Sequence, residues 1–155
     1  MHNNFIKDLL GFKDVILKNM KNFKDHIEIY LDLPVSEQIC PRCGSKTSTI
    51  HDYYTQPIKD IPINFKPTTL FLKKCRYECP SCHKTFYPSN NIVSKYGRKT
   101  NRLTEYIIHE LRNLISVSDV AKKTSTSPSF ISKLLPYLAV TNSKLPRVLC
   151  IDEFK

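Results

Sequence analysis

Two cysteine pairs constrain this chain more than any other feature of its sequence. Cys40-Pro-Arg-Cys43 and Cys79-Pro-Ser-Cys82 share the form Cys-Pro-x-Cys, and each such turn directs two sulfurs at one point. Two turns together supply four sulfurs, the tetrahedral set that a structural Zn²⁺ prefers. We therefore predict one structural zinc site formed by Cys40, Cys43, Cys79 and Cys82, with the rest of the chain built around it.

Other interpretations of the cysteines are weaker. A disulfide framework fits poorly, because the chain is rich in lysine and shows no signal peptide. A redox dithiol needs one Cys-x-x-Cys at a helix N-terminus, whereas both pairs here lie beside strand-like sequence. Cys75 leaves an ambiguity, since Cys75-x-x-x-Cys79 is also a usable ligand spacing. We expect Cys75 and Cys150 to be buried and inert, and His83 to stay solvated and away from the metal.

The charge of the chain indicates a polyanionic partner. The net charge is +10 and the isoelectric point is near 9.4. Residues 1–34 carry as many acidic as basic side chains, so the whole excess begins near the first cysteine pair. No apolar run reaches the length of a membrane span, so we expect a soluble chain without a membrane partner.

Alternation of apolar and polar residues predicts strands over residues 26–33, 54–61 and 68–77. Lys24-Asp25 is a plausible turn that makes a hairpin with the apolar residues 15–17, and residues 64–67 form a turn between the other two strands. A short helix precedes them and ends at Gly11. These patterns predict a helix and hairpin over residues 1–34 and a zinc ribbon over residues 35–97.

Helical periodicity follows over residues 103–114, 116–123 and 128–135, with N-caps at Thr100 or Asn101, at Ser116 and at Ser127. This layout over residues 98–139 predicts a helix-turn-helix, against the alternative of a plain three-helix packing unit. Small hydroxyl side chains and cations suit phosphates and base edges in a major groove. The predicted DNA contacts are Arg98, Lys99, Arg102, Lys122, Lys123, Ser127, Ser129, Ser132 and Lys133.

The last predicted element is a short apolar strand over residues 147–151, after a linker that begins at residue 140. It ends in Asp152-Glu153-Phe154, and a strand that delivers a carboxylate at its end is how RNase H-like nucleases place a first metal ligand. The predicted fold class is therefore α+β: a β-rich zinc ribbon, then an all-α helix-turn-helix unit of three helices, then one terminal strand.

In this order, the two Cys-Pro-x-Cys pairs, the strand pair, the helix-turn-helix layout and the string Ile151-Asp152-Glu153-Phe154 resemble one family. They are similar to the N-terminal part of an insertion-sequence transposase of the ISL-three family, over essentially residues 12–155. Its members carry a zinc ribbon, a helix-turn-helix and an RNase H-like catalytic domain with a DDE carboxylate triad. The resemblance implies that the four paired cysteines bind zinc and that Asp152 is the first catalytic carboxylate. The other two carboxylates would lie beyond Lys155.

The resemblance implies a DNA-binding fragment of a DDE transposase that recognises double-stranded transposon ends and does not cut DNA alone. It implies a cytoplasmic, nucleoid-associated protein, allows a homodimer, and reserves Mg²⁺ or Mn²⁺ for a full-length parent. One alternative is a stand-alone zinc-ribbon helix-turn-helix transcription regulator. Another is a zinc ribbon that serves as a protein-docking or dimerisation module.

Overall fold

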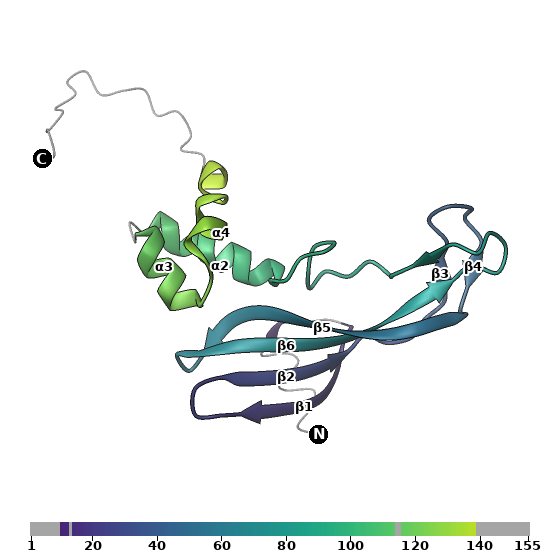
Figure 1. Ribbon diagram of the computed structural model, residues 1–155, viewed down its shortest axis with the longest axis horizontal. Coiled ribbons are helices and arrows are strands. Elements are labelled where there is room, and N and C mark those ends of the chain that lie inside the picture. The colour runs from purple at the N-terminus through teal and green to yellow at the C-terminus, as the bar shows by residue number, and fades with distance from the viewer. Residues whose placement is uncertain (1–9, 13, 114–115, 139–155) are drawn as a thin grey trace, which may run out of the picture.

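The computed structural model describes residues 10–12, 14–113 and 116–138 (Figure 1). The expected N-terminal helix falls outside these residues except for Leu10, and so do the predicted strand at 147–151, Cys150 and Asp152. Among the described helices, none is both long enough and apolar enough to cross a membrane.

The centre of the molecule is a sheet in the order β1-β2-β6-β5, with β7 added at one end of β6 (Figure 1). β1 and β2 form one antiparallel hairpin, β5 and β6 form a longer one, and β2 pairs with β6 in parallel. A separate two-stranded sheet joins β3 to β4. The strands are β1 (Ile16–Asn22), β2 (Ile27–Asp32), β3 (Gln38–Ile39), β4 (Lys46–Thr47), β5 (Ile50–Ile63), β6 (Lys66–Glu78) and β7 (Thr85–Phe86).

One face of this sheet packs into the larger of the two hydrophobic cores. Successive side chains of a strand point to opposite faces, and the alternating apolar positions of β2 and β6 are almost fully buried. The turn between β5 and β6 fits their twist, because Asn64 and Phe65 both have positive φ, as a tight hairpin turn requires. The core comprises Leu10, Phe12, Val15, Leu17, Ile27, Ile29, Leu31, Ile58, Leu70, Leu72, Ile92 and Val93.

Three short helices follow: α2 (Asn101–Arg112), α3 (Val117–Thr124) and α4 (Pro128–Ser132), with a 3₁₀ turn at Leu135–Leu138. The predicted caps Thr100 and Ser116 are confirmed, since their side chains accept hydrogen bonds from Leu103 N–H and Asp119 N–H. Ser127 is the N-cap residue of α4 but makes no side-chain cap bond, and α4 ends earlier than predicted.

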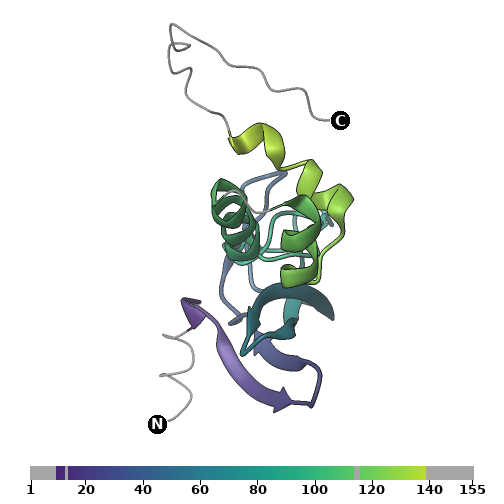
Figure 2. The same ribbon diagram turned by 90° about the vertical axis from the view of Figure 1, so that its left-hand side faces the viewer.

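The helices share a second hydrophobic core that also reaches the sheet. Its buried members come from all three helices, and Ile61 of β5 packs against them. The helices therefore lie over the β5 edge (Figure 2). The buried residues are Leu103, Ile107, Leu111, Val120, Ala121, Ile131 and Leu134.

The predicted fold class, a zinc ribbon followed by an all-α helix-turn-helix unit, is wrong. The described chain is rich in strands, with a five-stranded sheet and three short α-helices. The physical reason is that β2 pairs with β6, so the first hairpin and the ribbon strands share one sheet. The helices do not pack only on one another, because the partly buried Ile61 of that sheet packs against them.

A buried ion pair fixes the start of α2 to the sheet. The Asp60 side chain is fully buried in β5, and Arg102 donates to both of its oxygens, with Nε at 2.8 Å from Oδ1. Thr100 donates its hydroxyl to the same carboxylate at 2.7 Å. Arg102 also donates to the Leu10 carbonyl and lies 4.2 Å from the Phe12 ring centre. Sheet, helix and N-terminal segment therefore meet at this one guanidinium.

Candidate metal centre and basic surface

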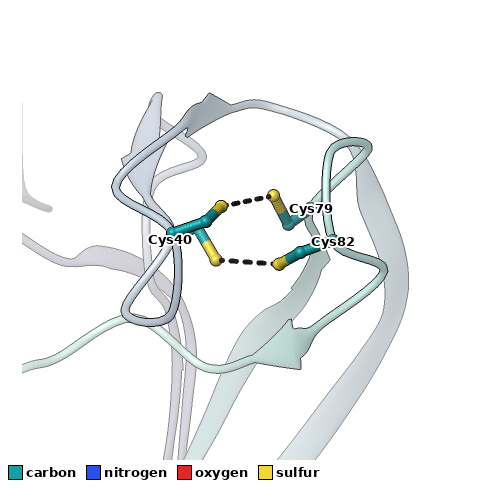
Figure 3. Close-up of side chains that lie close together, drawn as sticks. Cys40, Cys79 and Cys82 are labelled. Atoms are coloured by element: carbon teal, nitrogen blue, oxygen red, sulfur yellow. Dashed lines mark hydrogen bonds between the residues drawn. The ribbon is translucent and has the colours of Figure 1, made fainter.

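The four predicted cysteines converge at the end of the β5–β6 hairpin. All four Sγ atoms lie within 4.8 Å of one another. Cys40 Sγ is 3.7 Å from Cys82 Sγ, and Cys43 Sγ is 3.5 Å from Cys79 Sγ, so each pair faces the other across the site (Figure 3). A tetrahedral zinc with Zn–S bonds of ~2.3 Å separates its sulfurs by ~3.8 Å. The four cysteines thus fit a structural zinc ion, as predicted.

The two cysteine turns have the same backbone geometry. Gly44 N–H donates to the Cys40 carbonyl at 3.0 Å, and His83 N–H donates to the Cys79 carbonyl at 2.8 Å. The residue after the second cysteine has positive φ in both turns, +76° at Gly44 and +53° at His83. Glycine adopts this conformation without strain, whereas His83 does so at some cost. The repeated Cys-Pro-x-Cys sequence therefore produces a repeated turn.

Hydrogen bonds also join the segments that flank the two turns. Thr47 of β4 donates its hydroxyl to the Glu78 carbonyl at 2.7 Å and accepts from Thr49 N–H. Glu78 N–H donates in return to the Thr49 carbonyl at 3.0 Å. Thr47 is buried although polar, and these bonds satisfy it. These hydrogen bonds therefore help to position the two turns beside each other.

The thiols compete electrostatically at such short separations. The Ser45 hydroxyl, 3.4 Å from Cys43 Sγ, and the Ser45 backbone N–H stabilise the Cys43 thiolate and lower its pKa to about 6. The Lys84 N–H acts in the same sense on Cys82, but burial and the other three sulfurs outweigh it and raise the pKa of Cys82 to about 12. Four thiolates therefore require a cation between them, which is the role that a zinc ion fills.

The two remaining ligand candidates lie outside this cluster. Cys75 is buried in β6 and is not among the residues whose sulfurs converge. The His83 side chain is 80% exposed, with Nδ1 3.4 Å from a Glu78 carboxylate oxygen. Phe86 packs on the buried Tyr77, with ring centres 6.1 Å apart. The ligand set is thus the one predicted from Cys-Pro-x-Cys spacing.

Comparison with known proteins supports the assignment of a zinc site to this part of the chain. Residues 36–82 match a family model described as the zinc-finger of transposase IS204/IS1001/IS1096/IS1165. The match covers less than a third of the 155 residues and includes all four cysteines. It reaches neither the helices after residue 100 nor residues 147–155. Comparison with curated proteins and with solved structures finds no match.

All but one of the predicted DNA contacts fall into two groups in the structure. The first group is exposed on α3, α4 and the segment before α2, and comprises Arg98, Lys122, Ser127, Ser129, Ser132 and Lys133. Members of the second group interact within the protein. Arg102 holds the buried Asp60, and Lys123 donates to a carboxylate oxygen of the buried Glu110 at 2.6 Å. The sequence does not reveal these partners, because they come from distant segments.

Lys99 belongs to neither group. Its ammonium lies 3.9 Å from the Phe130 ring centre, and its side chain is half-buried. Burial and the nearby charge of Lys59 lower the pKa of Lys99. Lys59, on the β5 edge, is a basic residue that sequence reasoning did not select, since an exposed lysine in a strand carries no special signal.

Proposed function

We propose that this chain binds duplex DNA at transposon ends, as the recognition part of a transposase. The observation that supports this most directly is the match of residues 36–82 to a transposase zinc-finger family, at a site whose four sulfurs converge. The net charge of +10 supports the same conclusion, because neutralisation of phosphates supplies most of the non-specific affinity for DNA.

The zinc ion has a structural role in this proposal. Four sulfur ligands close the tetrahedral shell, whereas catalytic zinc sites keep one position for water or substrate. The ion would stabilise the two cysteine turns and with them the end of the β5–β6 hairpin. This chain's own cations, and not the metal, would therefore contact the nucleic acid.

The surface around α4 is the proposed contact with the major groove. Ser127, Ser129, Ser132 and Lys133 are exposed there, and Lys122 is exposed on α3. Hydroxyl groups donate to or accept from base edges, and lysines pair with phosphates. The cap residue Ser125 has positive φ and ends α3 sharply, which lets α4 start close to it.

The test is a titration of the zinc-loaded chain with a duplex that carries a transposon end, at two salt concentrations. Lys133→Glu should weaken binding and reduce the slope of log K against log salt by about 0.9, one phosphate contact. The matched control is Lys24→Glu, because Lys24 lies in the turn between β1 and β2, away from the β5 edge. Affinity that is independent of salt would contradict the proposal.

Binding to DNA without preference for transposon ends would leave general DNA binding and remove the transposon-end part of the proposal. Binding that prefers a promoter-like duplex would favour the transcription regulator instead. Asp152 lies outside the described residues, so its catalytic role stays a prediction, as does the homodimer.

A further inference from the structure

A short segment that precedes α2 pairs with the outer edge of β5. Lys59 N–H donates to the Arg98 carbonyl, and Thr100 N–H donates to the Lys59 carbonyl, both at 2.9 Å. These two backbone bonds align Lys59 in parallel with Lys99, although the residues are far apart in sequence. The arrangement places three cations, Lys59, Arg98 and Lys99, at the line where the sheet meets the helices.

A hollow of about 310 Å³ opens at this line, and we call it the seam hollow. Its wall contains three basic side chains and no acidic one. Within the described residues, none of the three cations forms an ion pair with a carboxylate. The seam hollow is lined by Pro57, Ile58, Lys59, Thr69, Arg98 and Lys99.

The contacts that the lysines do make position them without neutralising them. Lys59 Nζ donates to the Ser125 carbonyl at 2.6 Å, and Ser125 is the residue that ends α3. Lys99 Nζ lies 3.9 Å from the ring centre of Phe130 in α4. A carbonyl and an aromatic face attract a cation but carry no net charge. Both lysines line the hollow, and neither of these contacts compensates their charges.

The surroundings of Lys99 disfavour its charged form. Burial and the neighbouring Lys59 lower the pKa of Lys99, which means that its charged form is destabilised there. A bound anion reverses that effect, because an opposite charge at ~4 Å stabilises an ammonium. Lysine supplies a point charge and arginine a planar fork of donors, the combination that suits a phosphate group.

We propose that Lys59, Arg98 and Lys99 together bind one phosphate of the DNA backbone in the seam hollow. This inference rests on the proposed function and adds a site that includes a residue of the ribbon, Lys59. Lys59 contacts Ser125 and Lys99 contacts Phe130 of α4, so a phosphate bound by these lysines would fix the position of α4 relative to the groove. Backbone contacts of this kind set register and do not read sequence.

The experiment compares Lys59→Gln, Lys99→Gln and the triple variant Lys59→Gln/Arg98→Gln/Lys99→Gln with the parent chain. Affinity for one duplex is measured across a range of salt concentrations, and Lys24→Gln is the matched control. The triple variant should lower the salt slope by about 0.9, because the three cations share one phosphate. At about 0.1 M salt this corresponds to a loss of roughly eightfold in affinity. Zinc content and far-UV circular dichroism should not change.

A fall of about 2.7 in the slope would mean three separate phosphates and would overturn the shared site. An unchanged slope in the triple variant, with the parent chain still binding DNA, would overturn the seam hollow and leave the proposed function standing. Failure of the parent chain to bind any duplex would overturn both together. A loss in the triple variant only three times that of Lys24→Gln would show that only overall charge matters, because three charges are removed instead of one, and this also contradicts the site.

Discussion

The ion pair between Asp60 and Arg102 allows a sharp test of how the helices are attached to the sheet. The same strand carries a second aspartate–arginine pair of similar geometry, Asp52 with Arg76. The side chains of Asp60 and Arg102 are 0% and 25% exposed, whereas those of Asp52 and Arg76 are 43% and 34% exposed. The two pairs therefore differ in burial and in the further hydrogen bonds that Thr100 and the Leu10 carbonyl add to the buried pair, and Asp52→Ala is the exposed-pair control for Asp60→Ala.

Asp60→Ala should destabilise the protein by about 3 kcal/mol. Removing one member of a buried pair costs ~3–5 kcal/mol, because the other charge stays buried without a partner. The low end applies, since Arg102 is partly exposed and water can reach it. The Thr100 hydroxyl, also fully buried, loses its acceptor at the same time. Asp60→Asn should cost less, because the amide oxygen still accepts one hydrogen bond.

The measurement is urea unfolding of zinc-loaded protein. With an m-value of about 2 kcal/mol/M, the midpoint of Asp60→Ala should fall by about 1.5 M. Asp52→Ala should move it far less, because exposed pairs are solvated on both sides. Asp60→Leu/Arg102→Met should recover most of the loss, since no charge remains buried. Equal shifts for Asp60→Ala and Asp52→Ala would refute the argument from burial.

Two further predictions concern the metal site and pH. Cys82→Ser should lose zinc and the hydrogen bonds of the cysteine turns, while Cys75→Ser should keep one zinc per chain. Metal analysis measures the zinc content of both variants. Loss of zinc in Cys75→Ser would show that the ligand set is wrong. The ion pair with Lys123 lowers the pKa of Glu110 below its usual 4.5, so this carboxylate stabilises the fold above pH ~4.5 and the contribution disappears as pH falls. The difference in urea midpoint between the parent chain and Glu110→Gln should therefore be largest near pH 7 and shrink in acid, and a difference that grows in acid would contradict this assignment.

The zinc site was predictable because its signal is local. Each Cys-Pro-x-Cys turn consists of four consecutive residues. The two copies identify the ligands even though a long hairpin separates them. The caps Thr100 and Ser116 were predictable for the same reason, since a cap and the N–H that it binds are three residues apart. Alternation likewise indicated β2 and the centres of β5 and β6.

What the sequence did not reveal depends on contacts between distant residues. Strand alternation shows which face of β2 is buried but not that β2 pairs with β6, so the single sheet was missed. Arg102 reads as a surface cation near a helix start, and only the fold shows that Asp60 accepts its hydrogen bonds. Lys59 reads as an ordinary exposed strand lysine, and its neighbours Arg98 and Lys99 arrive through edge pairing.

The length of β6 has a consequence for how the molecule can lie on a duplex. Thr69 pairs with Lys59 at the seam hollow, and Glu78 precedes the first cysteine of the second turn. At ~3.3 Å per residue, the strand between them spans about 30 Å. One turn of B-DNA rises ~34 Å. If the chain binds DNA as proposed, a duplex lying along β6 would therefore place slightly less than one turn of the double helix between the seam hollow and the metal site.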